Sequence, residues 1–324
     1  MNVSSLKPAG APAAPAAPRP KVLAGLTAKK LVTPSRTLLY GVEGIGKSTF
    51  ASQAPKPIFL GSEDGTSQLE VYRYPKPLQR ARDIFEALDV LEHEEHDFET
   101  VVLDTVDWAE PLIWAEVCAD AGKRSIEDFG FGKGYVAAQD EWRRLLARFD
   151  AIRAKRRMHV VLLGHSTVRS FANPEGDNFD RYQLKMHEKS AGILREWVDC
   201  VLFANYETFA VKAGDASKKA KGVSSGSRVV HTERRAAFDA KNRYALPEKL
   251  PLDWAEYWAA IQAHRPQEPG ALREQIEAML GEIADDDLAE KVRAAVTGAG
   301  DDAVKLAAFA NKVSVRLQEK RDKQ

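Results

Sequence analysis

The sequence predicts an α/β fold: a mainly parallel sheet covered by helices on both faces, followed by a small helical domain. Three observations lead to this prediction. Continuous apolar runs alternate with helical segments from residue 38 to residue 204, which is the pattern of a parallel sheet buried on both faces. Two short strand-like runs, at 228–232 and 236–240, suggest antiparallel strands added at the sheet edge. After residue 270 the apolar residues recur only at helical spacing.

The composition excludes several classes of protein. Lysine plus arginine equals aspartate plus glutamate, at 47 each, so any nucleic-acid site must be a local patch on a chain without overall basic charge. No stretch is apolar enough to span a membrane, and the amino terminus lacks the apolar region of a signal peptide. Cys118 and Cys200 lie far apart among apolar neighbours and are expected to be buried thiols in a reducing compartment. We therefore expect a soluble cytoplasmic protein.

The chain divides into four predicted parts. Residues 1–20 are rich in alanine and proline and could not form a core, so we expect a disordered tail. A core domain is expected at 21–264, where the apolar segment 22–28 packs on its own domain or on a neighbouring subunit. Residues 265–270 have the composition of a linker. Three amphipathic helices are expected in 271–324, with Gly298 and Gly300 separating the second from the third.

The most informative stretch joins the first predicted strand to the helix after it. Gly41, Gly46, Lys47 and Ser48 match the phosphate-binding pattern G-x-x-x-x-G-K-[ST], although an ordinary glycine-rich turn is the alternative. Glycines let backbone N–H groups approach phosphate oxygens, and the first turn of a helix attracts anions. Lys47 is expected to reach the β- and γ-phosphates, and the Ser48 hydroxyl to bind Mg2+. A nucleoside triphosphate would be cradled by Gly41, Val42, Glu43, Gly44, Ile45, Gly46, Lys47, Ser48 and Thr49.

Charged and imidazole side chains end the strands that follow. The strand at 57–61 leads into Glu63, the strand at 100–104 ends in Asp104, and the strand at 159–165 ends in His165. The helices expected between them lie near 83–95, from about residue 108, and at 135–155. Because ligands bind at the carboxyl ends of parallel strands, these side chains are expected to gather around the triphosphate.

Each of these residues has a functional and a structural interpretation. Asp104 suits the acidic position that holds Mg2+ next to Ser48, or else it caps the following helix, for which Asp107 is the better candidate. Glu63 could orient water in line with the γ-phosphate, or it could be a solvated turn carboxylate. His165 could sense the γ-phosphate and pass the signal to the following loop, or it could be a structural histidine.

The later chain carries weaker patterns. A polar loop with aromatic residues is expected at 168–185, a helix near 189–197 and a strand at 200–204. The runs at 228–232 and 236–240 flank a charged loop, and 254–263 is expected to form a closing helix.

Together these stretches resemble the RecA-like ATPases, and in particular phage-encoded nucleotide-binding proteins described as AAA-family, including single-strand-annealing recombinases of the Sak type. The resemblance covers about Leu31 to Ala259. It rests on Gly41–Ser48, Ser62–Gly65, Leu103–Thr105, Phe129–Tyr135, Gly164–Ser166, Glu196–Asp199 and Ala240–Arg243. It implies a RecA-type core, ATP with Mg2+, oligomers with ATP at subunit interfaces, and a role in DNA recombination or replication. One departure is His165, which stands where the bacterial recombinases carry a glutamine.

The resemblance also bears on which residue acts as the base. In the RecA class the catalytic glutamate follows the strand after the phosphate-loop helix, whereas in the AAA class it sits beside the acidic magnesium residue. Here the residue after Asp104 is Thr105, which cannot serve as a base, so Glu63 is favoured, with Asp64 as a near competitor.

Two cations late in the core could complete the site from another subunit. Lys241 and Arg243 stand two residues apart, so on a strand they point to the same face. In ring-shaped RecA-like helicases a similar Lys-x-Arg reaches the neighbouring subunit's γ-phosphate. The resemblance therefore implies that Arg243 is an arginine finger in trans with Lys241 as its companion. The alternative is a solvated strand end.

Single-stranded DNA is expected to bind two basic segments. Cations in a glycine- and serine-rich loop suit contacts with the phosphate backbone, and mixed aromatic and basic side chains suit stacking on bases. The alternative for each segment is a solvated surface insertion. The residues concerned are Arg169, Phe171, Phe179, Arg181 and Tyr182 in the first segment, and Lys212, Lys218, Lys219, Lys221 and Arg228 in the second.

These observations predict an ATP-binding and ATP-hydrolysing RecA-like DNA recombination protein that binds single-stranded DNA and promotes annealing or strand pairing. The expected partners are single-stranded DNA, further copies of the chain and a single-strand-binding protein, in the cytoplasm of a bacterial host if the gene is phage-encoded. A ring helicase or translocase on the same core is the first alternative. A small-molecule P-loop kinase is another, but the sequence shows no arginine-rich lid. A nucleotide-gated interaction module without hydrolysis is the third.

Overall fold

The computed structural model describes residues 33–61, 66–76, 78–211, 221–264 and 269–321. Within these residues a single sheet carries ten strands, in the order β10-β8-β7-β1-β5-β4-β2-β3, with β6 added to β5 and β9 to β7. The strands are β1 (Arg36–Gly41), β2 (Pro57–Gly61), β3 (Tyr72–Arg73), β4 (Thr100–Asp104), β5 (His159–Phe171), β6 (Phe179–Leu184), β7 (Cys200–Val211), β8 (Lys221–His231), β9 (Lys241–Asn242) and β10 (Lys249–Pro251).

The centre of the sheet is parallel and its later additions are antiparallel. β1 pairs in parallel with β5 on one side and with β7 on the other, and β4 pairs in parallel with β5 and β2. β8 pairs antiparallel with β7, and β10 with β8. The predicted α/β fold, with a mainly parallel central sheet and antiparallel strands added at its edge, is confirmed.

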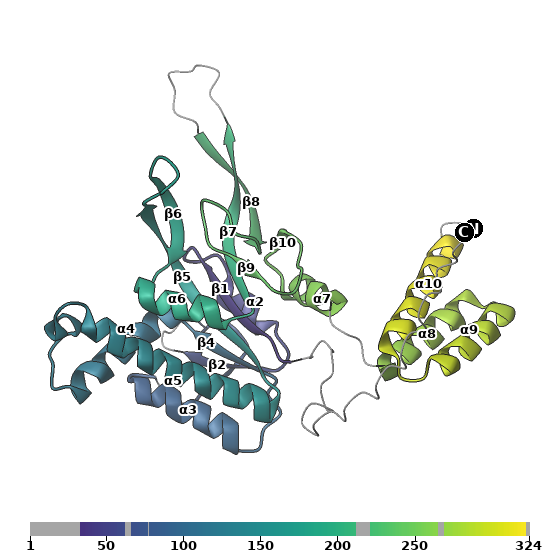
Figure 1. Cartoon of the computed structure of the whole chain (residues 1–324), viewed down its shortest axis with the longest axis horizontal. Helices are drawn as coiled ribbons and strands as arrows, with labels where there is room; N and C mark the ends of the chain where they lie inside the picture. Colours follow the sequence, from purple (N-terminus) through teal and green to yellow (C-terminus); the bar gives the residue numbers. More distant parts are fainter. Residues whose placement is uncertain (1–32, 62–65, 77, 212–220, 265–268, 322–324) are drawn as a thin grey trace, which may run out of the picture. The chain divides into compact units, whose positions relative to one another are not determined.

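Helices cover both faces of this sheet, because successive side chains of each buried strand point to opposite sides. On one face Leu38 and Tyr40 of β1 pack against α3 (Ala81–His93), α4 (Val106–Asp120), α5 (Lys133–Arg156) and α6 (Glu188–Trp197). The apolar stripe predicted along α5 is buried there, at Trp142, Leu145, Leu146, Phe149 and Ile152. On the other face Leu39 packs against α2 (Lys47–Ser52) and α7 (Trp254–His264) (Figure 1).

Two antiparallel arms extend beyond the carboxyl edge of the sheet (Figure 1). β5 continues past His165 and pairs with β6 from Ser166 to Phe171, and β7 continues past Ala204 to Val211 beside β8. At about 3.3 Å per residue, these extensions reach about 20 Å past the edge. Because β1 lies between β5 and β7, the arms rise on either side of the loop that follows β1.

Two expectations about these segments are wrong. Residues 168–185 are not a loop but the outer part of β5, a turn and β6. The run at 236–240 is not a strand, since only Phe238 forms isolated bridges there. The run at 228–232, by contrast, falls almost entirely within β8.

The last three helices pack on one another around a core of their own. They are α8 (Pro269–Ile283), α9 (Asp286–Ala299) and α10 (Ala303–Arg321), and Leu272, Ile276, Leu306 and Val313 form the centre of that core. α9 ends before Gly300, whereas Gly298 lies within it, and α8 begins inside the segment predicted as a linker. Among the described helices, none has the length and apolar character that crossing a bilayer requires.

Candidate nucleotide-binding site

The glycine-rich loop between β1 and α2 is held close to the neighbouring strand. Gly41 ends β1 opposite His165 of β5 and Ala204 of β7, and a Cβ atom on Gly41 would lie 2.2 Å from the carbonyl oxygen of Ala204. Gly46 adopts φ = 104°, a conformation that strains any other residue. Gly41 is therefore required because there is no room for a Cβ atom, and Gly46 because of its backbone conformation.

The side chains of Lys47 and Ser48, at the end of this loop, face different partners. The Lys47 ammonium donates to the carbonyl oxygens of Gly41 at 3.4 Å and Val42 at 3.1 Å. The Ser48 hydroxyl donates to Asp104 Oδ2 at 2.7 Å. The sequence separates Ser48 from Asp104 by 56 positions, and the structure brings the two side chains into contact; their binding of Mg2+ stays a prediction.

Asp104 ends β4 and is 2% exposed. Burial raises the pKa of this carboxyl above its ordinary value, and the hydrogen bond from Ser48 and the charge of Lys47 oppose that rise. A desolvated carboxylate beside a hydroxyl is a pair of hard oxygen donors, which is the chemistry that Mg2+ prefers. The described residues contain no cluster of three or more His, Cys, Asp or Glu side chains for a metal, so phosphate oxygens and water would complete the ligand set.

Asp107 does not cap α4, and the expectation that it does is wrong. The N-cap position belongs to Thr105. The Asp107 carboxylate instead binds His165 twice, accepting the backbone N–H at Oδ1 and contacting ring Nδ1 with Oδ2, both at 2.9 Å. Burial acts to raise the pKa of Asp107, but these bonds outweigh it and the pKa lies below its ordinary value. His165 is thus fixed within β5, opposite Gly41, and its imidazole lies near enough to influence the pKa of Asp104.

Glu110 is a titratable group that the sequence did not single out. It is 4% exposed, and its Oε2 accepts the backbone N–H of His187 at 2.9 Å, at the start of α6. Burial raises its pKa to about 7, against hydrogen bonds from His187 and Ser190. Its spacing from the buried Val106, Ile113 and Val117 could have placed it on the inner face of α4.

The other residues of the predicted triphosphate site are placed as follows. Glu63 and Asp64 lie outside the described residues. Glu43 is exposed on the loop and lies 3.7 Å from the ammonium of Lys185, just after β6. Gly44 and Thr49 are exposed as well, and Ile45 is buried in the core below the loop.

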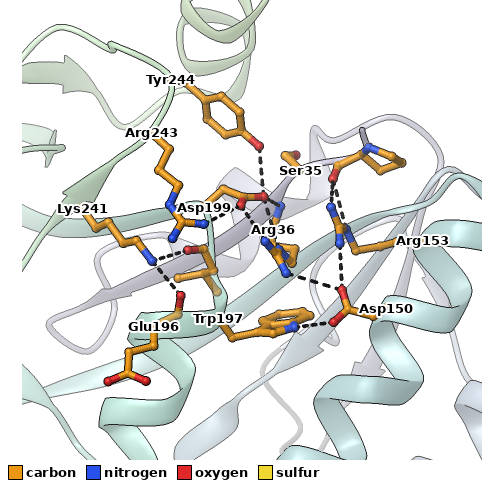
Figure 2. Close-up of polar contacts among 12 residues, drawn as sticks. Ser35, Arg36, Asp150, Arg153, Glu196, Trp197, Asp199, Lys241, Arg243 and Tyr244 are labelled. Atoms are coloured by element: carbon orange, nitrogen blue, oxygen red, sulfur yellow. Dashed lines mark hydrogen bonds and ion pairs between the residues drawn. The ribbon is translucent and has the colours of Figure 1, made fainter. Parts of the chain in front are cut away.

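Lys241 and Arg243 lie near the amino ends of the strands, where their side chains contact groups of α6 and Asp199 (Figure 2). Lys241 pairs with Val201, three residues before Ala204, and its ammonium donates to the carbonyl oxygens of Arg195, Glu196 and Val198 at the end of α6. Arg243 lies 3.4 Å from Asp199 with its side chain 54% exposed. Both cations thus have partners within the chain, and their action on a neighbouring subunit stays a prediction.

Asp199 is the centre of that network. Its Oδ1 accepts from the Arg36 guanidinium at 2.8 Å, and its Oδ2 accepts the Arg36 backbone N–H and the Tyr244 hydroxyl, both at 3.1 Å. Arg36 also lies 3.5 Å from Asp150, which accepts the indole N–H of Trp197 (Figure 2). The network ties β1, β7, α5 and the segment after β9 together at the amino ends of the strands.

The first predicted DNA segment forms the β5–β6 arm, and its residues differ in availability. Arg169 is exposed, with one contact to the carbonyl oxygen of Met186 at 3.3 Å. Phe171 and Phe179 pack on each other across the hairpin, with ring centroids 5.3 Å apart, inside the range of about 4.5–7 Å that is usual for aromatic pairs. Tyr182 packs against Phe203 in the core.

Arg181 corrects the DNA expectation. Its side chain is 4% exposed and its guanidinium donates to Asp239 at 2.6 Å. A buried, paired arginine holds the arm to the core and cannot also contact DNA phosphates.

The second predicted DNA segment is described only in part. Lys212, Lys218 and Lys219 lie outside the described residues, as does the side chain of Lys221, whose backbone begins β8. Arg228 is exposed on β8, and its guanidinium lies at the glycine-rich loop, 3.4 Å from the carbonyl oxygen of Ile45.

Comparisons with known proteins bear on the family to which this chain belongs. A family described as an AAA domain matches residues 33–244, which spans the glycine-rich loop, Asp104, His165 and Lys241. No curated protein matches the chain. A crystal structure of the RadB recombinase aligns at 15% identity over 63% of this chain and 84% of that one, with a TM-score of 0.36, a likeness too low to support a statement about function.

Proposed function

Because the chain belongs to the AAA domain family, we propose that it binds and hydrolyses ATP as a RecA-like DNA recombination protein. The observation that carries this proposal is the contact between Ser48 and Asp104 at 2.7 Å, directly after the glycine-rich loop. It joins the two protein groups that a magnesium–triphosphate complex needs, a hydroxyl and a carboxylate, next to the phosphate-binding lysine.

The roles of the side chains follow from their placement. Lys47, now held by two loop carbonyls, would turn to the β- and γ-phosphates when these enter. Ser48 and Asp104 would hold Mg2+, which supplies charge neutralisation on the phosphate oxygens. Glu63 would accept a proton from the water that attacks the γ-phosphate, and His165, fixed by Asp107, would sense that phosphate.

We assign single-stranded DNA to the two arms. The arms rise on either side of the glycine-rich loop, so DNA held between or along them would lie next to the bound triphosphate. Arg169 on the first arm would supply positive charge for phosphate contacts, as would Lys212, Lys218, Lys219 and Lys221, which follow β7 in the sequence. Binding of this kind would promote annealing or strand pairing, as in the Sak-type recombinases of phages.

ATP between subunits is the next part of the proposal. Arg243, half exposed on its own chain, would reach the γ-phosphate of a neighbour with Lys241 beside it. Mixing Arg243→Ala chains with Lys47→Ala chains tests this, because hybrid interfaces with one intact site would regain ATPase activity. No recovery in the mixture would contradict a trans-acting Arg243. We also propose a core at 21–264 and a helical domain at 271–324, a cytoplasmic location (in a bacterial host if the gene is phage-encoded), and a single-strand-binding protein as a partner.

The decisive test of the function is ATPase activity with and without single-stranded DNA. Wild type should be stimulated by DNA, and Glu63→Gln should lose both basal and stimulated activity while it still binds ATP. A wild type that fails to bind single-stranded DNA at low salt would overturn the recombination role and leave ATP binding standing. Directional unwinding of a duplex in place of annealing would favour the helicase alternative.

A further inference from the structure

Arg228 holds a position that the DNA-binding expectation does not explain. Its Nη1 lies 3.4 Å from the carbonyl oxygen of Ile45, inside the glycine-rich loop. A Cβ atom built on Gly46, the next residue of the loop, would lie 2.8 Å from the same nitrogen. The guanidinium therefore rests directly on the backbone that precedes Lys47.

The sheet fixes this placement. Arg228 pairs with Tyr206 on β7, two residues past Ala204, which itself pairs with Gly41 at the start of the loop. On the other side of β8, the backbone N–H of Leu252 donates to the carbonyl oxygen of Arg228 at 3.1 Å. The backbone at Arg228 is thus held from both sides, and only the side chain is free to adjust.

The contact that Arg228 makes is a weak one for a guanidinium. Charge-assisted hydrogen bonds to anions are usually about 2.7–2.9 Å long, whereas this contact is 3.4 Å and its acceptor is a neutral carbonyl. Among the ion pairs of the described residues, none involves Arg228, although most other arginines on the core pair with carboxylates. Lys47 makes the same kind of contact, with loop carbonyls at 3.1 and 3.4 Å.

From these contacts we propose that Arg228 binds the phosphates of ATP in its own subunit. A guanidinium offers two parallel N–H donors to phosphate oxygens, and its charge is permanent, so it suits a phosphate site better than it suits a carbonyl. Arg228 and Lys47 then form a pair of cations at the loop, one from β8 and one from α2. This inference rests on the proposed ATPase function and moves Arg228 from the DNA surface to the nucleotide.

The assignment also connects the two ligands. Arg228 lies in the part of β8 nearest the core, whereas Lys221, at the other end of the same strand, lies in the second arm. A phosphate that draws the guanidinium off Ile45 changes a contact at the base of that arm. The strand that binds the nucleotide at one end therefore carries the proposed DNA surface at the other.

The test is calorimetric titration of the full chain with ATP and with ADP, in the presence of Mg2+. Arg228→Ala should weaken ATP binding by about tenfold to hundredfold, the usual effect of losing a charge-assisted hydrogen bond. The ATP affinity of Arg228→Lys should lie between those of wild type and Arg228→Ala, because lysine keeps the charge but lacks the two parallel N–H donors. Arg234→Ala is the matched control, because the Arg234 side chain is 66% exposed and its ion-pair distance to Asp239 is a long 3.6 Å. The ATP affinity of this variant should equal that of wild type.

Single-stranded DNA binding without nucleotide supplies the second readout. Arg228→Ala should keep its DNA affinity, whereas Arg169→Ala should lose part of it. Unchanged ATP and ADP affinity in Arg228→Ala, with or without a lower melting temperature, would show that Arg228 only holds Ile45 and would overturn the inference. Loss of DNA affinity in place of ATP affinity would overturn it too. A wild type that binds no ATP would instead refute the proposed function from which the inference starts.

Discussion

Replacing Asp199 by alanine is expected to destabilise the protein strongly while leaving the triphosphate site intact. The Asp199 side chain is 11% exposed and that of its partner Arg36 is 19% exposed, with 2.8 Å between Oδ1 and the guanidinium. The substitution leaves the Arg36 charge largely buried and also removes the acceptor of the Tyr244 hydroxyl (Figure 2). Breaking a fully buried pair costs about 3–5 kcal/mol, so for this slightly exposed pair we expect about 2–4 kcal/mol.

Arg243→Ala provides the control on the other side of the same carboxylate. Its side chain is 54% exposed and its contact with Asp199 is 3.4 Å long, so its loss should cost less than about 1 kcal/mol. If Arg243 acts in trans, this variant should nevertheless lose ATPase activity. The contrast separates a stabilising role of the network from a catalytic role of its outer member.

Urea unfolding, followed by circular dichroism at several pH values, measures both effects. Burial acts to raise the pKa of Asp199, but the bonds from Arg36 outweigh it and hold the pKa below its ordinary value. The contribution of Asp199 is therefore present at neutral pH, above the unfolded pKa of about 3.9, and is lost as the pH falls through the lower folded pKa. A loss below about 1 kcal/mol in Asp199→Ala, or an equal loss in Arg243→Ala, would refute this reasoning.

Three further changes test the region around the glycine-rich loop. Asp104→Asn should raise the Mg2+ concentration for half-maximal ATPase activity by about tenfold to hundredfold, and an unchanged requirement would remove Asp104 from the metal site. Asp107→Asn should lower the free energy of unfolding at pH 7 by about 1.5–3 kcal/mol. That loss should shrink in acid, because the lowered pKa of Asp107 makes its contribution present at neutral pH and absent below the folded pKa. Burial raises the pKa of Glu110 from 4.5 to about 7, so its carboxyl ionises at a lower pH in the unfolded chain than in the folded one. The free energy of unfolding of wild type should therefore fall by about 3 kcal/mol as the pH rises from 4 to 8. A profile that stays flat over this range would contradict the raised pKa. In Glu110→Gln that dependence should be absent.

The sequence was sufficient to predict the elements whose buried residues form a regular apolar pattern. β1, β2, β4 and the inner part of β5 are continuous apolar runs, and the long helix α5 has one apolar face, so both kinds of element could be predicted. The contact of Ser48 with Asp104 followed from one rule, that carboxyl ends of parallel strands meet at the same edge.

The sequence was insufficient to predict segments that extend beyond the core and contacts that depend on distant strands. The outer part of β5 is exposed at Val168, Arg169 and Ser170, so no face of it is buried and no alternation of apolar residues marks it as a strand. Arg228 could not be distinguished from the lysines before it, because its place at the glycine-rich loop depends on the register of β8 with β7. Asp107 likewise showed only a position in a first helical turn, and its partner His165 comes from a distant strand.

Titration of the full chain with ATP and Mg2+, for wild type and Lys47→Ala, tests the central claim most directly. The account predicts saturable binding of one ATP per chain by wild type, and binding weakened by at least about tenfold in Lys47→Ala, since a charged phosphate contact is lost. Equal affinity in the two proteins, with both folded, would contradict the assignment of the triphosphate to this loop.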